Sequence, residues 1–180
     1  MVYVFLADGF ETVEALCPVD VMRRAGLELK TVSVTEELTV QSRQGVRVIC
    51  DALLEDVSLE GAQLLFLPGG MPGADNLANS AGLCELLVDA NERGVLLAAI
   101  CAAPYVLGQL GILEGKRATC YPGFEDRLTG AVIDNKKVVI DKNCITGAGM
   151  GVSLEFALAI VSTLCSPQKA EEIRSSVLAD

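Results

Sequence analysis

The stretch VLLAAICAAP at residues 95–104 decides how this chain folds. Its first six residues form an apolar run with the length of a buried strand, and Pro104 presets the first turn of a helix that we expect over 102–110. Cys101 lies where the strand gives way to the helix, next to small alanine residues that allow the backbone to turn tightly. The pattern predicts a strand, a sharp turn and a helix, with the Cys101 thiol projecting from the turn.

The same alternation of apolar strand and helix runs through the whole chain. Strands are predicted at 2–7, 29–34, 63–67, 95–100 and 144–147. Helices are predicted at 11–25, 80–93, 102–110, 152–165 and from Pro167 to about Leu178. This order is typical of βαβ units, so we expect an α/β fold with a mainly parallel sheet and helices on both faces, in one domain over 1–180.

Two further segments are predicted to be antiparallel hairpins appended to the sheet. They lie at 38–50 and 131–141, and the second is expected to turn at Asp134 and Asn135.

The 180 residues include no histidine, which removes whole classes of function at once. Ser-His-Asp triads, Cys-His dyads within the chain and histidine-anchored zinc or haem sites cannot be built from this composition. The seven cysteines form no CxxC pair, and the start of the sequence does not have the form of a signal peptide. We therefore expect a cytoplasmic protein without a bound metal, whose chemistry depends on cysteine, carboxylates, tyrosine, lysine or backbone dipoles.

Charge and hydropathy narrow the range of partners. The net charge of −10 argues against nucleic acids and anionic membranes, because binding phosphates needs a positive patch. Residues 94–113 carry no charge over the length of a membrane-spanning helix, but Pro104, Gly108 and Gly111 interrupt them. We expect a protein that handles small molecules or other proteins and does not enter a membrane.

Cys101 is the first candidate for chemistry, because ligands of doubly wound sheets bind beyond the carboxyl ends of the strands. At the start of a helix, the dipole and the unpaired N–H groups favour the thiolate over the thiol. Cys101 is thus either a reactive nucleophile or a small buried hydrophobic residue, and position alone does not choose between them.

Glu14 is the second candidate. A helix over 11–25 puts Glu14 on one stripe with Cys17, Pro18 and Val21, and this stripe is expected to face the sheet. Burial would raise the pKa of the carboxyl, so that Glu14 could donate a hydrogen bond to a thiolate or carry a proton. If Pro18 instead marks the start of the helix, Glu14 is an ordinary surface charge.

Two glycine-rich stretches follow other predicted strands. Gly69 and Gly70 either direct backbone N–H groups at a developing oxyanion or form a plain turn. The sequence GAGMG at 147–151 could cradle an anion, but it lacks the spacing of a dinucleotide-binding loop, so we expect no nucleotide cofactor.

Five motifs together resemble the ThiJ/PfpI superfamily, and within it the DJ-1 branch. They are ADGFETVEALCPVDVMRRAG at 7–26, LLFLPGGMPGADNL at 64–77, AAICAAP at 98–104, ATCYPGFE at 118–125 and SLEFALAIV at 153–161. The resemblance covers nearly the whole chain. It implies a flavodoxin-like (class I glutamine amidotransferase-like) sandwich, usually a homodimer, that works without a cofactor.

The resemblance also implies roles for individual residues. Cys101 matches the nucleophile, and Glu14 matches the acid that hydrogen-bonds it. Arg43 resembles an arginine that approaches the site from the dimer partner. The backbone donors of the pocket match Gly69, Gly70 and Ala102.

Three positions depart from the family's pattern. Ala102 stands where protease-like branches have a histidine, so we expect no peptidase activity. Tyr121 stands where DJ-1 has a histidine near the pocket, and a tyrosine hydroxyl is a poor general base at neutral pH. Ala148 stands where the family commonly has an arginine, which removes a cation and part of the expected dimer contact.

The sequence leads to three hypotheses about function: the two that follow, which depend on Cys101, and a protein-binding or chaperone module, which would require an exposed apolar patch. In the first, Cys101, Glu14 and Tyr121 convert 2-oxoaldehydes such as methylglyoxal or glyoxal, or their adducts on glycated proteins, to 2-hydroxy acids. In the second, oxidation of Cys101 serves an oxidative-stress sensor or chaperone without significant turnover.

Overall fold

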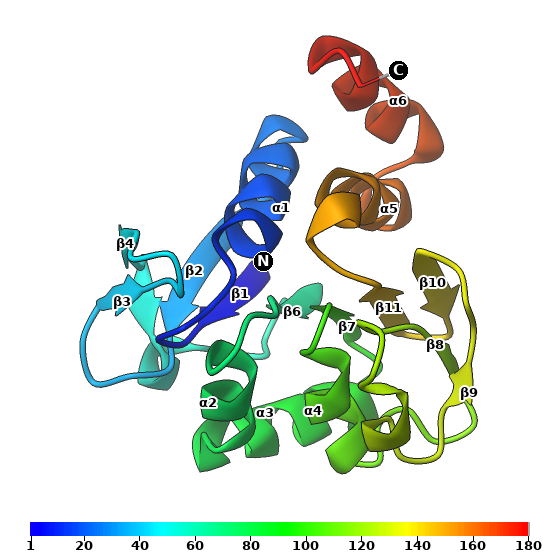
Figure 1. The fold of residues 1–180 in the computed structure, drawn as a ribbon. Coiled ribbons are helices and arrows are strands. Elements are labelled where there is room, and N and C mark those ends of the chain that lie inside the picture. Colours follow the sequence, from blue (N-terminus) through cyan, green and yellow to red (C-terminus); the bar gives the residue numbers. More distant parts are fainter. Residues whose placement is uncertain (180) are drawn as a thin grey trace.

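The computed structural model describes residues 1–179, which are built around a seven-stranded sheet (Figure 1). The strand order is β10-β11-β7-β6-β1-β2-β5, and all neighbours are parallel except β10 and β11. In chain order these strands are β1 (Val2–Leu6), β2 (Leu29–Ser33), β5 (Ala52–Leu53), β6 (Leu64–Leu67), β7 (Leu96–Ile100), β10 (Val138–Asp141) and β11 (Cys144–Gly147). The mainly parallel sheet and its five apolar strands are as predicted.

Helices cover both faces of the sheet, which confirms the predicted flavodoxin-like α/β sandwich (Figure 1). One layer contains α1 (Thr12–Arg24) and α5 (Ser153–Leu164), with α6 (Pro167–Ser176) packed on α5. The other layer contains α2 (Gly73–Ala78), α3 (Ala81–Glu92) and α4 (Pro104–Gln109). Pro18 lies inside α1 rather than at its start, so the stripe that carries Glu14 faces the core.

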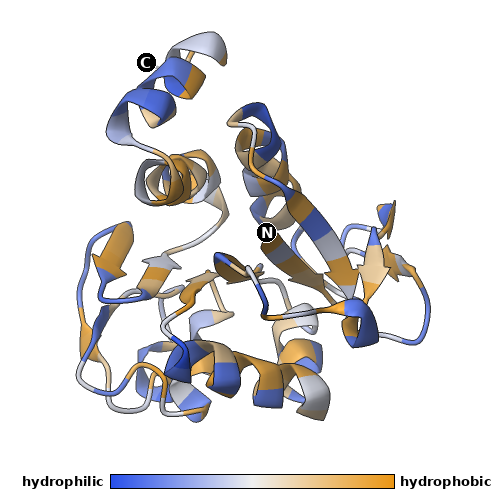
Figure 2. Cartoon of the chain, turned by 180° about the vertical axis from the view of Figure 1, so that it is seen from behind, coloured by the Kyte–Doolittle hydropathy of each residue, from blue (hydrophilic) through white to orange (hydrophobic). Residues whose placement is uncertain are grey.

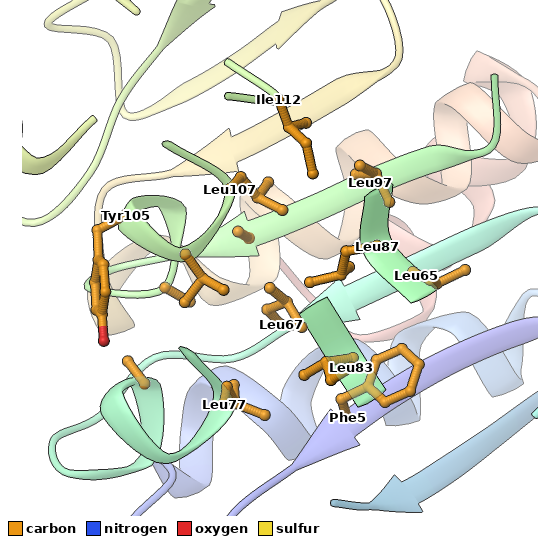
Figure 3. Close-up of a cluster of buried hydrophobic side chains, with 14 of the residues drawn as sticks. Phe5, Leu65, Leu67, Leu77, Leu83, Leu87, Leu97, Tyr105, Leu107 and Ile112 are labelled. Carbon is orange, nitrogen blue, oxygen red and sulfur yellow. The ribbon is translucent and has the colours of Figure 1, made fainter. Parts of the chain in front are cut away.

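A hydrophobic core lies on each side of the sheet, because the central strands are apolar on both faces. Figure 3 shows the core beside α3 and α4, where Leu67, Leu83 and Tyr105 are buried. In the opposite core, the rings of Phe66 and Phe156 lie 5.4 Å apart between centroids. Figure 2 shows hydrophobic strands and a mostly hydrophilic α6. Dense packing on both faces fixes the carboxyl ends of the strands, where the candidate site lies.

The hairpin predicted at 38–50 is confirmed. Within it, β3 (Thr39–Gln41) pairs antiparallel with β4 (Arg47–Ile49). The loop between these strands folds back onto the residues before α1, where the Arg43 N–H donates to the Phe10 carbonyl (3.0 Å). This contact brings the loop to the edge of the sheet at which β1 ends.

The prediction of an antiparallel hairpin at 131–141 is wrong. Its first part, β9 (Val132–Ile133), pairs in parallel with β8 (Arg117–Ala118). Its second part, β10, continues to a turn at Lys142 and pairs with β11. Lys142 has a φ of 51°, in the left-handed region that tight hairpin turns use, and it therefore closes a different hairpin from the one predicted.

The uncharged run at 94–113 divides into β7 and α4, as predicted. Across residues 1–179, the structure has no helix that is both long enough and apolar enough to cross a membrane.

Candidate active site

Cys101 stands at the elbow between β7 and α4, and the predicted sharp turn is confirmed. Its φ of 65° lies in the left-handed region, which costs a non-glycine residue roughly 1–2 kcal/mol. The Cys101 N–H donates to the Gly147 carbonyl (2.8 Å), and the Tyr121 N–H donates to the Cys101 carbonyl (2.8 Å). The end of β11 and the loop that contains Tyr121 therefore hold the strained elbow in place.

Glu14 lies in the first turn of α1, with 1% of its surface exposed. Its Oε2 accepts a hydrogen bond from the Gly69 N–H (3.0 Å), and its carboxyl shares a hydrogen bond with the Cys101 thiol. Burial raises the pKa of Glu14 from 4.5 to about 7, and the hydrogen bond with Cys101 opposes that rise. The predicted burial of this carboxyl is confirmed, and Glu14 gains or loses its proton near neutral pH.

The surroundings of Cys101 favour the thiol over the thiolate. Burial, followed by the negative charge of Glu14, raises the pKa of Cys101 to about 12, although the N–H groups of Ala102 and Gly70 lower it. The pKa of Cys101 is therefore raised, whereas the position at the start of a helix predicts a lowered pKa and a thiolate. The reason is that α4 begins only at Pro104, beyond the elbow, whereas a carboxyl lies directly beside the sulfur. Attack by this sulfur requires a base, and Glu14 is the base in contact with it.

The two glycines after β6 have different contacts. The N–H of Gly70, like that of Ala102, is directed at the Cys101 sulfur. The N–H of Gly69 is bound to Glu14, so Gly69 is not the oxyanion donor that the sequence predicts. A Cβ on Gly69 would lie 2.5 Å from Glu14 Oε2 and 2.7 Å from Cys101 Cβ, so only glycine leaves room for the acid and the thiol to meet.

A cavity of about 240 Å³ opens beside the Cys101 sulfur. It is lined by Glu11, Glu14, Arg43, Gly70, Met71, Cys101, Ala102, Tyr121, Phe124 and Met150. Three larger depressions, around Leu54, Val88 and Ala159, are more open and hold no buried acid beside a thiol. The structure thus brings Cys101, Glu14, Gly70, Ala102 and Tyr121 together at one cavity.

Arg43 lies at the cavity of its own chain, so a cation reaches this cavity without a contribution from a dimer partner. The β3–β4 loop folds over the start of α1 and carries Arg43 Nε to 4.0 Å from Glu11 Oε2. The guanidinium is about half exposed, so this chain places a cation at the mouth of its own cavity.

The rim of the cavity is formed by residues that are partly open to solvent. Tyr121 and Met150 are 51% and 52% exposed. Met150 lies two residues after Ala148, so this part of the wall is apolar where the family's arginine would supply charge. Phe124 was not predicted as a site residue, although the ATCYPGFE motif contains it; its ring stacks on Tyr105, with centroids 6.2 Å apart.

The donors at the cavity suit a small carbonyl compound. Thiol, carboxyl, guanidinium and backbone N–H groups can add to a carbonyl group, move its protons and bind its oxygen. No group of three or more His, Cys, Asp or Glu side chains within residues 1–179 is arranged to hold a metal ion.

A parallel sheet between two helix layers, with a cysteine at a left-handed elbow beside a buried glutamate, defines a flavodoxin-like protein with a cysteine-centred site. Residues 1–163 match the model of the DJ-1/PfpI family. The chain belongs to the DJ-1/PfpI family, as the sequence motifs indicate.

Individual relatives agree with this assignment. The chain is 37% identical to Protein DJ-1 homolog B of Arabidopsis thaliana over 93% of its own length, but it spans only 39% of that protein. It is 36% identical to the Glutathione-independent glyoxalase DJR-1.2 of Caenorhabditis elegans, over 91% of this chain and 87% of the relative. Among solved structures, oxidized Toxoplasma gondii DJ-1 superposes with a TM-score of 0.94 at 35% identity, covering 98% of this chain and 97% of the other.

Proposed function

We propose that this protein is a cofactor-independent glyoxalase or deglycase that converts 2-oxoaldehydes, or their adducts on proteins, to 2-hydroxy acids. The proposal rests on one observation, the hydrogen-bonded pair of Cys101 and Glu14 at the wall of a small cavity. A relative at 36% identity that is named a glyoxalase supports it. A cavity of about 240 Å³ suits a substrate of a few heavy atoms.

The first step joins the substrate to the enzyme. The Cys101 sulfur adds to the aldehyde carbon of methylglyoxal while the Glu14 carboxylate takes the thiol proton. A sulfur–carbon bond forms, the carbonyl π bond breaks, and protonation of the oxygen gives a hemithioacetal. The N–H groups of Gly70 and Ala102, which face the sulfur, lie close to the oxygen in which negative charge develops.

The second step moves a proton between the two substrate carbons. A carboxyl whose pKa is near 7 can take the proton from the former aldehyde carbon and return it to the former ketone carbon through an enediol. The product is a thioester of lactate, and water hydrolyses it to lactate and free thiol. One carbon is oxidised and its neighbour is reduced, so the sequence needs no external oxidant or reductant.

Turnover of methylglyoxal tests this proposal directly. We expect the wild type to form lactate from methylglyoxal, and no lactate above background from Cys101→Ala. Cys84→Ala is the matched control, because Cys84 lies outside the cavity and donates to the Ala78 carbonyl (3.3 Å). Equal lactate formation by wild type and Cys101→Ala would exclude the mechanism.

A second candidate is an oxidative-stress sensor that acts through the same cysteine. It is favoured by the similarity to a structure described as oxidized DJ-1, and by a neutral Glu14 that could donate a hydrogen bond to a sulfinate. Mass spectrometry after mild peroxide treatment separates the candidates. Selective oxidation of Cys101 with negligible turnover of aldehydes supports the sensor, and equal oxidation of all seven cysteines excludes it.

A further inference from the structure

A second cysteine lies beside a nucleophile at the opposite end of the sheet. Cys144 opens β11 and is 2% exposed, and Lys116, which precedes β8, is 7% exposed. The two segments are neighbours in the fold (Figure 1). Lys116 Nζ lies 3.3 Å from Cys144 Sγ. An amine and a thiol, both buried, are therefore in direct contact at a place that the proposed function does not use.

The partners of Lys116 make this contact unusual. Its ammonium group donates to Asn143 Oδ1 (2.7 Å), to Asn91 Oδ1 (3.2 Å) and to the sulfur of Cys144. A buried ammonium is ordinarily paired with a carboxylate, but the three acceptors of Lys116 are two amide oxygens and a thiol sulfur. The third hydrogen bond of the Lys116 ammonium group therefore goes to a sulfur atom and not to an oxygen.

We propose that Lys116 and Cys144 are a redox-controlled cross-linking site, at which hydrogen peroxide joins Nζ and Sγ in a sulfenamide bond. Peroxide first oxidises the thiol to a sulfenic acid and is reduced to water. Lys116 then loses its ammonium proton, and the free amine attacks the sulfur. The N–S bond forms, the S–O bond breaks and a second water leaves. In total, one thiol, one ammonium and one peroxide give one sulfenamide, two waters and one proton.

The surrounding side chains can accommodate the product. After the reaction Nζ keeps one hydrogen, which can remain on Asn143 Oδ1. Asn91 Oδ1 loses the lysine as a donor but still accepts a hydrogen bond from Asn143 Nδ2 (3.1 Å). Both amide oxygens therefore stay satisfied. Asn91 and Asn143 are only partly buried, so two of the four side chains of the cluster reach the surface, and peroxide is small enough to approach the sulfur past them.

The bond would also restrain the fold. It joins residues that are 28 positions apart in the sequence, so it closes a loop in the unfolded chain as a disulfide does. Oxidation should therefore raise the melting temperature by several degrees, and thiol reductants should reverse the rise.

Peptide mapping of the full-length protein tests the proposal. After brief peroxide treatment and alkylation of free thiols, digestion without reductant should give the peptides of Lys116 and Cys144 joined, lighter by two hydrogen atoms than their sum. Dithiothreitol should release both peptides unmodified. Cys84 serves as the internal control, because its thiol donates to a backbone carbonyl rather than contacting an amine.

Two variants separate the cross-link from simple oxidation. Lys116→Arg retains a charged donor but lacks the primary amine, and Cys144→Ser retains a small polar group but lacks the sulfur; neither should give joined peptides or a reversible rise in melting temperature. Oxidation of Cys144 to a sulfinic acid with Lys116 unmodified would overturn the proposal. Joined peptides that retain an additional oxygen would overturn the condensation step. The result does not depend on aldehyde turnover, so it can fail while the proposed function stands.

Discussion

Two cysteines on neighbouring parallel strands, β7 and β11, have opposite partners. Cys101 follows the carboxyl end of β7 and contacts the acid Glu14, whereas Cys144 begins β11 and contacts the amine of Lys116. Burial raises the pKa of both thiols, but the charge of Glu14 adds to the effect at Cys101 while the charge of Lys116 opposes it at Cys144. The residue type is the same at both ends of the sheet, and the neighbouring charge decides the chemistry.

The carboxyl edge of the sheet has two features that suit the proposed catalysis. At Cys101 the partner is a base that can take the thiol proton, and a cavity leaves room for a substrate. At Cys144 the partner is a cation held by two amide oxygens, and the surrounding side chains leave the Cys144 residue 2% exposed. A proton acceptor and open space beside the sulfur distinguish the proposed active site from the proposed cross-linking site.

The largest expected effect is on turnover. Glu14→Gln removes the base, so we expect the rate of lactate formation from methylglyoxal to fall by roughly 10²–10⁴-fold. In the wild type the rate should rise as Glu14 loses its proton around pH 7 and level off above it, because the pKa of Glu14 is about 7. Glu60→Gln, at an exposed loop position, is the control. A Glu14→Gln variant with the wild-type rate and pH profile would remove the distinction between the two thiols.

The second effect is on stability. Because burial raises the pKa of Glu14 from 4.5 to about 7, the unfolded chain loses this proton at lower pH than the folded chain does. The contribution of Glu14 to the free energy of unfolding is complete below pH 4.5, falls as the pH rises to about 7, and is then lost. The loss amounts to about 3 kcal/mol.

Denaturant unfolding at several pH values measures this effect. Glu14→Gln lacks the titrating group, so its stability relative to the wild type should increase by about 3 kcal/mol between acid and slightly alkaline pH. Glu60→Gln should follow the wild-type curve. Parallel curves for wild type and Glu14→Gln would show that the carboxyl is not held in a desolvated environment.

The smallest effect is expected at the other end of the sheet. Cys144→Ser keeps an acceptor for Lys116, so the free energy of unfolding should fall by only about 1 kcal/mol, and turnover should change by less than about twofold. Chemical denaturation and the lactate assay measure the two quantities. A large loss of turnover in Cys144→Ser would mean that the two ends of the sheet are coupled.

The sequence predicts the fold well where the pattern is repeated. Apolar strands alternating with helices identify the sheet, and the strand that ends before Cys101 predicts the elbow because it has a clear end followed by Pro104. Shorter helices and strands cannot be predicted in this way. β5 and β8 have two residues each and α2 has six, which is too few to show a period. The prediction of a hairpin at 131–141 was wrong because turn-forming residues do not determine which strand the following segment pairs with.

The candidate site is predictable in its residues but not in its electrostatics. The burial of Glu14 follows from the helical stripe of α1, which depends on local spacing alone. The state of the Cys101 thiol depends on a contact between residues 87 positions apart in the chain, and the sequence cannot give their separation in space. For the same reason, the structure was needed to show that Gly69 binds Glu14 and that Arg43 reaches the cavity of its own chain.

At position 101, the left-handed backbone favours one residue type, whereas the proposed chemistry requires another. Glycine adopts a φ of 65° without strain, so a glycine there would relieve roughly 1–2 kcal/mol of backbone strain. Under the proposed function, selection for folding would favour glycine at position 101, whereas selection for a reactive thiol would oppose it. A library randomised at this position and screened for expression would therefore be expected to enrich residues that a screen for aldehyde consumption would discard.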